Sequence, residues 1–141
     1  MTEKIRLASV SGGKDSTTTL LLAIEQHPAD EVCGAFADTG NEHEATYDYV
    51  RYIEQATGVA IKWLRQDFTD WWWRRRTYVA EKWPGKGVDA ATVARALAVY
   101  DKGPFGNPYL DLCVIKNRFP SRRAQFCTQF LKTEPLTEYA L

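Results

Sequence analysis

The sequence predicts an α/β fold, with a parallel β-sheet and flanking helices in the first half of the chain and a helical second half. Apolar segments of strand length alternate with helix-length segments over residues 4–64. Loops that contain glycine follow the first two apolar segments, and the alternation stops after Leu64. Strands alternating with helices form right-handed crossovers, which build a parallel sheet. We therefore expect a Rossmann-like arrangement with a helical C-terminal half.

The expected elements of the first half are, in order, a strand over 4–10, a helix over 16–27, a strand over 32–37, a helix over 43–57 and a strand over 59–64. Asp15 or Ser16 can cap the first helix, and Pro28 stops it because proline cannot continue a helix. The second helix has apolar residues at helical spacing, and Gly58 is placed to cap its C-terminus.

The expected elements of the second half are helices over 70–82 and 88–100, a loop over 101–108 and a helix over 122–132. The loop contains two prolines and two glycines, which interrupt regular structure. Ser121 follows Pro120 and is expected to cap the last helix.

A chain of 141 residues can bury a core of its own, and we expect one domain over residues 1–141. Its 18 Lys and Arg balance 18 Asp and Glu, and 45% of its residues are apolar, which argues against disorder, collagen and coiled coil. The sequence has no apolar run of the roughly 20 residues that span a bilayer, and its start lacks the apolar segment of a signal peptide. We expect a cytoplasmic protein without a membrane partner.

The charges are distributed unevenly along the chain. Residues 25–54 contain eight acidic residues against Arg51, whereas residues 112–133 contain five basic residues and no acidic one. This polarity has two interpretations: the two regions attract each other and solvate the surface, or the basic region faces an anionic ligand.

The segment Ser11-Gly12-Gly13-Lys14-Asp15-Ser16 lies between an expected strand and an expected helix. Successive backbone N–H groups can converge on an anion at such a position, and glycine lets an oxygen approach the backbone closely. The serine hydroxyls add donors and Lys14 adds charge. The segment is not a Walker P-loop, which needs G-x-x-x-x-G-K-[ST]. It predicts a phosphate-binding loop, against the alternative of a capped Gly-Gly turn.

Three segments of the sequence resemble one known family. S-G-G-x-D-S after the first strand is the PP-loop signature of the adenine nucleotide α-hydrolases, or ATP pyrophosphatases, which include the phosphoadenosine phosphosulfate (PAPS) reductases. Residues 38–42, followed by Thr46-Tyr47, resemble the D-T-G loop and the next helix of the PAPS reductase branch. Residues 119–136 are similar to the segment of that branch that ends K-x-E-P. The resemblance covers nearly the whole chain in the expected order.

The resemblance implies an adenine nucleotide ligand, either ATP or PAPS, at the carboxyl ends of the strands, where open parallel sheets bind ligands. The implied phosphate and nucleotide contacts are Ser11, Gly12, Gly13, Lys14, Asp15, Ser16, Asp38, Thr39, Gly40, Arg122, Arg123 and Lys132. Asp38 is a magnesium ligand, a ribose or water contact, or an N-cap of the following helix. The arginines and Lys132 supply positive charge for phosphate or sulfate. His43 either touches the ligand or lies on the surface at the start of a helix.

The cysteines depart from the family pattern. Cluster-containing members of this branch have a Cys-Cys pair where this chain has Phe126-Cys127, and a later C-x-x-C, so we expect no iron–sulfur cluster from this chain alone. Other reductases use a catalytic cysteine in a C-terminal E-C-G-x-H segment, relative to which this chain is short. Cys127 lies among arginines, which favour the thiolate, and is a candidate nucleophile beside Lys14; the alternative is a buried structural thiol.

The spacing of the three cysteines suggests neither a disulfide framework nor a zinc site, and Cys33 and Cys113 are expected in the core.

The family reaction implied is thiol-dependent reduction of PAPS or adenylyl sulfate to sulfite. It would require a thiol reductant protein, and a second copy or a partner chain could supply the missing segment. The loop keeps the complete form of enzymes that cleave ATP, so an ATP pyrophosphatase with magnesium, acting in sulfur transfer or nucleic-acid modification, is an alternative. The third possible function is that of a non-catalytic module that binds a nucleotide or interacts with another protein.

The run Trp71-Trp72-Trp73-Arg74-Arg75-Arg76 has the composition of a nucleic-acid surface, because aromatic rings stack on bases and arginines contact phosphates. On a helix, however, these tryptophans point in several directions, and at least one face is expected to be core. The run has three interpretations. It packs in the core or at a subunit contact, it binds nucleic acid, or Arg74 to Arg76 bind the substrate.

Overall fold

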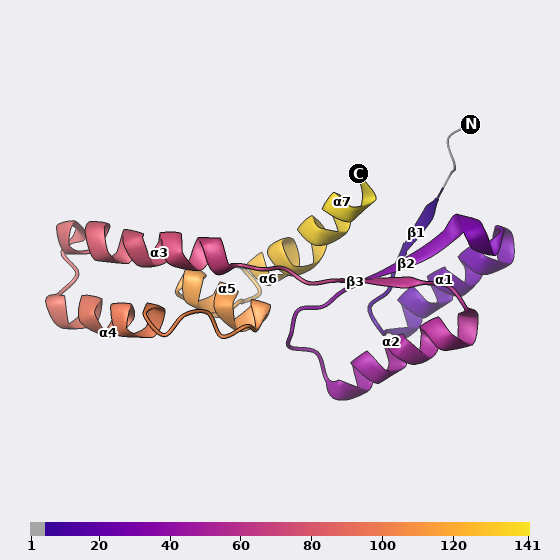
Figure 1. The fold of residues 1–141 in the computed structure, drawn as a ribbon, viewed down its shortest axis with the longest axis horizontal. Coiled ribbons are helices and arrows are strands. Elements are labelled where there is room, and N and C mark those ends of the chain that lie inside the picture. Colours follow the sequence, from indigo (N-terminus) through magenta and orange to yellow (C-terminus); the bar gives the residue numbers. More distant parts are fainter. Residues whose placement is uncertain (1–4) are drawn as a thin grey trace. The chain divides into compact units, whose positions relative to one another are not determined.

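The computed structural model describes residues 5–141; Lys4, the first residue of the first expected strand, lies outside the described residues. The chain divides into two compact units. The first unit contains the chain up to Gln66 together with Thr128–Leu141, and the second contains Asp67–Cys127. The expectation of one domain stays a prediction, and each unit is described by itself below (Figure 1).

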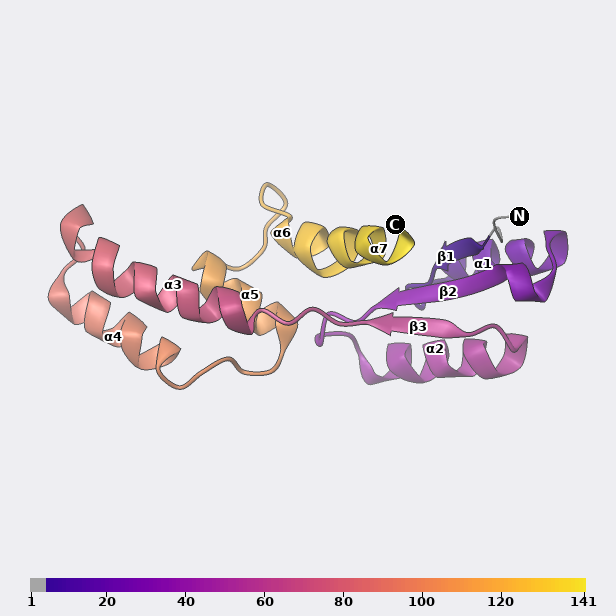
Figure 2. The same ribbon diagram turned by 45° about the horizontal axis from the view of Figure 1, so that its top comes forward.

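The first unit is built on a parallel three-stranded sheet in the order β1-β2-β3, as the alternation of segments predicted. Its strands are β1 (Arg6–Ser9), β2 (Val32–Ala37) and β3 (Ile61–Leu64). Helix α1 (Lys14–Gln26), followed by the short turn η1 (Ala29–Glu31), connects β1 to β2, and α2 (Glu44–Thr57) connects β2 to β3 (Figure 2). The register aligns Ala8 with Gly34 and Gly34 with Ile61.

The core of this unit is a single apolar cluster to which the sheet and both connecting helices contribute. Leu20 of α1, Val50 of α2 and Phe36 of β2 are fully or almost fully buried in it. Gly34 lies in the middle of the sheet, where an added Cβ would be 3.0 Å from Ile61, so the centre of the sheet has no room for a side chain. Gly58 ends α2 at φ 69°, as predicted.

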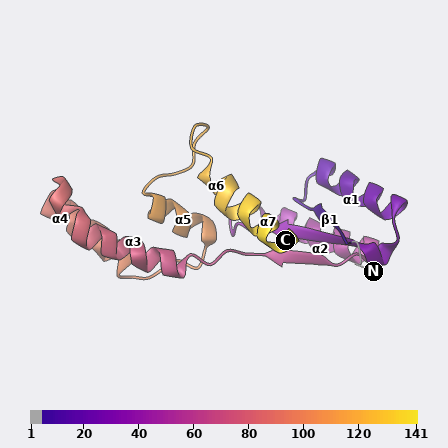
Figure 3. The same cartoon turned by 90° about the horizontal axis from the view of Figure 1, so that it is seen from above.

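Two further elements of the first unit come from the end of the sequence. A π-helical turn, η3 (Gln129–Thr133), buries Leu131 and continues into α7 (Glu134–Ala140). Helix α7 contacts β2, so the last residues of the chain pack on the same sheet as the first (Figure 3).

The second unit is helical, as predicted, and contains α3 (Thr69–Lys82), the turn η2 (Pro84–Lys86), α4 (Ala90–Tyr100) and α5 (Pro108–Lys116). Trp72 and Val79 of α3 are fully buried, and the Trp72 Nε1 donates to the Tyr100 carbonyl at 3.0 Å. One face of the Trp71–Arg76 run is therefore core, as the packing interpretation required. In the described part of the chain, no helix is long and apolar enough to cross a membrane.

The loop expected over 101–108 is present up to Asn107, but one helix of the second half was missed and the expected start of another was wrong. This loop is followed by α5, which was not predicted; Asn107 caps it by accepting from the Leu110 N–H. The helix expected over 122–132 begins at Phe126, in α6 (Phe126–Thr128). Ser121 is not its cap, because the backbones of Ser121 and Ala124 hydrogen-bond to each other and close a tight turn.

Candidate functional site

Two loops of the first unit leave the same edge of the sheet. The loop that contains Ser11 follows β1, and the loop that contains Asp38 follows the adjacent strand β2. The Val10 N–H donates to the Ala35 carbonyl, and the Asp38 N–H donates to the Leu64 carbonyl, both at 2.8 Å. These bonds extend the sheet by one residue into each loop. The arrangement is the carboxyl edge of a parallel sheet, where such folds bind ligands.

The first loop depends on glycine for its shape. Gly12 has φ 79°, and a Cβ there would lie 2.8 Å from the Thr46 Cγ2 of α2. Gly13 is the N-cap of α1, and no side chain caps this end of the helix. The first N–H groups of a helix have no partner within it and favour a bound anion. This end of α1 therefore has the geometry of an oxyanion site.

The serines of the loop bind each other and the backbone. The Ser16 Oγ accepts from the Ser11 N–H at 3.0 Å and donates to the Gly13 carbonyl at 3.0 Å, and the two serine hydroxyls are 3.1 Å apart. The expectation that Asp15 or Ser16 caps α1 was wrong, because both lie inside the first turn and the Ser16 hydroxyl points back toward Ser11. Lys14 and Asp15 are exposed.

The carboxylate of Asp38 is held by three groups. Its Oδ1 accepts from the Gly40 N–H at 2.8 Å and from the Tyr47 hydroxyl at 2.9 Å, and its Oδ2 is 2.7 Å from an Arg65 nitrogen. Burial by itself raises the pKa of Asp38, but hydrogen bonds from Gly40, Arg65 and Tyr47 outweigh it and hold the pKa below its usual value. Burial and the bond to Asp38 raise the pKa of Tyr47.

The other groups of this loop are also engaged. Thr39 is buried, and its hydroxyl donates to the Glu42 carboxylate at 3.0 Å. His43 caps α2, because its Nδ1 accepts from the Ala45 N–H at 3.1 Å. The N-cap role considered for Asp38 therefore belongs to His43, which lies on the surface at the helix start.

Magnesium stays a prediction, because this ion is commonly held by one or two carboxylates together with phosphate oxygens. Both oxygens of Asp38 already have partners, and residues 5–141 hold no group of three His, Cys, Asp or Glu placed for a metal ion.

Lys132 lies beside Ser11 of the first loop, and its role toward a phosphate stays a prediction. Its Nζ is 3.8 Å from the Glu42 carboxylate. A small cavity of about 40 Å³ is lined by Ser9, Val10, Ser11, Phe36, Ala37, Glu42, Lys132 and Leu136. A volume of this size holds about one water molecule. A nucleotide at this edge would therefore lie over the exposed loop rather than inside the fold.

Arg65 was missed by the sequence analysis. It follows β3 directly, so its position after a strand at the same sheet edge was the signal that could have identified it. The structure thus brings residues 11–16, residues 38–40, Lys132 and Arg65 together in one unit.

The remaining candidates are described within the second unit. Arg122 and Arg123 are exposed in the turn that Ser121 and Ala124 close. Cys127 is partly buried near Cys113, whose pKa is raised by burial first and further by Cys127. Cys113 is buried, as expected, whereas Cys33 is half-buried. The roles of Arg122, Arg123 and Cys127 toward the first loop stay predictions.

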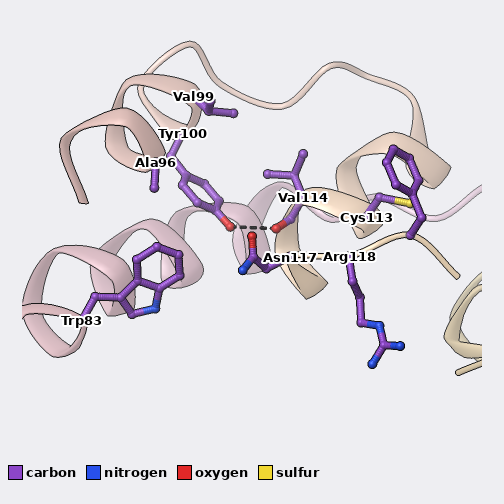
Figure 4. A pocket seen from close by; sticks show the side chains of 9 residues that line it. Trp83, Ala96, Val99, Tyr100, Cys113, Val114, Asn117 and Arg118 are labelled. Atoms are coloured by element: carbon purple, nitrogen blue, oxygen red, sulfur yellow. Dashed lines mark hydrogen bonds between the residues drawn. The ribbon is translucent and has the colours of Figure 1, made fainter. Parts of the chain in front are cut away.

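The second unit also holds an apolar cavity of about 430 Å³ that the sequence analysis did not identify (Figure 4). Trp83, Val99 and Phe119 contribute to its lining, and Arg118 is its one charged lining residue. The Tyr100 hydroxyl donates to the Val114 carbonyl at 3.0 Å across it. None of the predicted site residues lines this cavity.

A parallel sheet with a glycine loop between its first strand and first helix defines an α/β protein of nucleotide-binding type. The family model of the phosphoadenosine phosphosulfate reductase domain matches residues 6–99, and the chain belongs to this family. The family is part of the PP-loop adenine nucleotide α-hydrolase-like superfamily. The matched region contains both loops of the sheet edge.

Two phage proteins are similar to this chain. An uncharacterized 37.8 kDa protein of Escherichia phage 186, from the gpa 5′ region, is 41% identical over 144 residues, covering 95% of this chain and 41% of that protein. The uncharacterized nin region protein ORF290 of Escherichia phage lambda is 29% identical over 136 residues, covering 96% of this chain and 42% of that protein. The chain spans about two fifths of the length of these relatives. No solved structure matches significantly.

Proposed function

We propose that the first unit binds an adenine nucleotide, with its phosphates on the loop of residues 11–16. The observation that supports this most is the uncapped N-terminus of α1 behind Gly12 and Gly13, in a chain of the PAPS reductase family. Backbone N–H groups and the helix dipole would bind the phosphates, and Lys14 and Lys132 would add charge. Asp38, held in place by Arg65, would face the sugar.

The reaction proposed is reduction of a sulfonucleotide, PAPS or adenylyl sulfate, by thiols. A thiolate attacks the sulfate sulfur, the bond from sulfur to the nucleotide phosphate oxygen breaks, and the nucleotide leaves. A second thiol then forms a disulfide with the first sulfur and releases sulfite, so two thiols supply the two electrons. Cys127 is the candidate for the first thiol, and a dithiol reductant protein supplies the electrons overall.

Cleavage of ATP to AMP and pyrophosphate is the second candidate. It is favoured by the complete loop, in which Ser11, Lys14 and Ser16 are all present and Lys14 is exposed. Both reactions use the same phosphate site, so the products distinguish them. Sulfite from PAPS in the presence of a dithiol supports reduction, and pyrophosphate from ATP supports the alternative. Tight binding without either product would leave nucleotide binding as the function.

Calorimetric titration with ATP, PAPS and adenosine bisphosphate tests nucleotide binding. A Gly13→Asp variant places a carboxylate at the phosphate site, where an added Cβ meets nothing closer than the Ser11 Oγ at 3.4 Å. Aspartate is a good N-cap, so we expect a folded protein with affinity reduced about a hundredfold. Gly85→Asp is the matched control, because Gly85 has open space around it. No binding by the wild type, or equal binding by Gly13→Asp, would overturn the proposal.

A Cys127→Ser variant separates binding from chemistry. If Cys127 is the nucleophile, the variant binds PAPS as the wild type does but releases no sulfite. Sulfite release at the wild-type rate would remove Cys127 from the reaction.

A further inference from the structure

The Trp71–Arg76 run forms a hollow on the second unit that the nucleotide site does not use. Trp71, Arg74, Arg75 and Tyr78 of α3 line a hollow of about 380 Å³. These residues are three, four and seven positions apart, so they share one face of the helix. Trp72 and Val79 occupy the neighbouring face and are fully buried. The hollow therefore lies on a face of the run that the buried core does not occupy.

Basic side chains are held against the aromatic rings of this hollow. The Arg75 guanidinium lies 4.7 Å from the centre of the Tyr78 ring, and the Lys116 Nζ lies 4.7 Å from a Trp71 ring centre. The Lys86 Nζ donates to the Tyr78 hydroxyl at 2.6 Å. Cation–π contacts of this kind position the charges without neutralising them. Three elements, α3, η2 and α5, thus bring cations to one place.

Two arginines of the hollow, Arg74 and Arg75, are not paired with a carboxylate of the described residues. Arg76, outside the hollow, is paired with Asp101 at 2.6 Å, whereas Arg74 and Arg75 form no ion pair among residues 5–141. The Arg75 Nε is the one buried side-chain nitrogen or oxygen in the described part of the chain without a hydrogen-bond partner. No acidic residue lines the hollow, although Asp70 and Glu81 are exposed elsewhere on α3.

The ligand chemistry follows from the rings and the spread of the charges. Phosphodiester groups bind arginine and lysine, and unpaired bases stack on aromatic rings and guanidinium planes. Cations contributed by three separate elements suit an extended polyanion better than a single phosphate. Paired bases in a duplex cannot stack on these side chains. We propose that this hollow binds single-stranded nucleic acid.

Fluorescence anisotropy with a labelled single-stranded DNA of about 20 nucleotides, and with RNA of the same sequence, tests the proposal at low salt. The double variant Arg74→Gln/Lys86→Gln changes two exposed side chains, so the fold is retained. We expect affinity about tenfold weaker and a log–log salt dependence shallower by about 1.4, for two lost phosphate contacts. Trp71→Leu, which removes a stacking surface, should weaken binding about tenfold on its own.

The control Arg95→Gln/Lys102→Gln removes the same charge from exposed positions of the second unit outside the hollow. It should change the affinity by less than about threefold. The Gly13→Asp variant should bind the DNA as the wild type does, which separates this hollow from the nucleotide loop. The proposal is overturned by absence of binding at low salt, by equal losses in the two double variants, by equal binding of a blunt duplex, or by loss of binding in Gly13→Asp.

Discussion

The two compact units of this chain carry opposite charges. The first has twelve Asp and Glu against seven Lys and Arg, a net charge of −5, and the second has eleven Lys and Arg against six Asp and Glu, a net charge of +5. The second unit also contains four of the five tryptophans. The net charge of the whole chain is zero because the charges of the two units cancel. Any anion site in the first unit therefore lies in a unit of negative net charge, and any in the second lies in a unit of positive net charge.

In the nucleotide site proposed for the first unit, the backbone would supply the donors, because Gly13 is the N-cap of α1 and no side chain caps this end of the helix. In the hollow of the second unit, lysine and arginine side chains held on aromatic rings would supply them. Backbone donors act through direction and need little net charge, whereas side-chain cations act through charge and need a packed aromatic support. The first unit should therefore be sensitive to changes at glycine, and the second to changes at tryptophan.

The largest effect is expected from Trp72→Ala in the second unit. This side chain is fully buried, and the substitution opens a large cavity and removes one of the two donors to the Tyr100 carbonyl, which keeps the Gly103 N–H. We expect the free energy of unfolding to fall by about 3–5 kcal/mol. Urea denaturation followed by far-ultraviolet circular dichroism measures it. Trp73→Ala is the control: Trp73 is exposed, and its loss should cost less than about 1 kcal/mol. Similar losses for both would contradict an aromatic support centred on Trp72.

Gly12→Ala tests the backbone of the glycine loop in the first unit. Its effect on the free energy of unfolding is expected to be the next largest. An alanine there meets a positive φ of 79° and a contact of 2.8 Å to the Thr46 Cγ2. We expect a loss of about 2–3 kcal/mol in the free energy of unfolding, together with weaker nucleotide binding. Gly87→Ala, at the same φ but with open space, should cost only about 1 kcal/mol. Equal costs in urea titrations would mean that the loop is not crowded against α2.

The first unit was largely predictable because its signals are local. Apolar runs separated by loops predicted β1, β2 and β3 in order, and the glycine loop after β1 indicated the site. The position of Arg65 directly after β3 indicated the same sheet edge, but its contact with Asp38 also depends on how β3 pairs with β2.

The second unit was harder to predict because tertiary contacts decide its details. Helix α5 follows directly on a loop rich in proline and glycine, and Asn107 and Pro108 start it. The tight turn at Ser121 and Ala124 rests on a backbone pairing that no residue type in that segment indicates. The sequence indicated that at least one face of the Trp71–Arg76 run is core, but which tryptophan is buried depends on the contacts of α3 with α4 and α5.

Asp38→Asn in the first unit should have a moderate effect that depends on pH. The pKa of Asp38 is lower in the folded chain than its usual value near 3.8, so its stabilisation is present above about pH 4 and is lost as the pH falls through the folded pKa. We expect the variant to lose about 1–2 kcal/mol near pH 7, and the difference from the wild type to narrow as the pH falls below about 4. Asp48→Asn, at an exposed pair with Arg51, is the control. A difference that stays constant with pH in urea titrations would exclude the carboxylate charge as its source.

The smallest effect is expected for the ion pair of the second unit, Arg76 with Asp101. Its atoms are close, at 2.6 Å, but the Asp101 side chain is 52% exposed, whereas the Asp38 side chain in the pair with Arg65 is 13% exposed. Water screens the Arg76–Asp101 pair more than the Arg65–Asp38 pair. A double-mutant cycle with Arg76→Gln and Asp101→Asn should therefore give a coupling energy of about 0.5 kcal/mol or less. The same cycle with Arg65→Gln and Asp38→Asn should give a larger value, since Gly40 and Tyr47 also fix the carboxylate. A reversed order would mean that the exposure of the carboxylate does not set the relative strength of these two ion pairs.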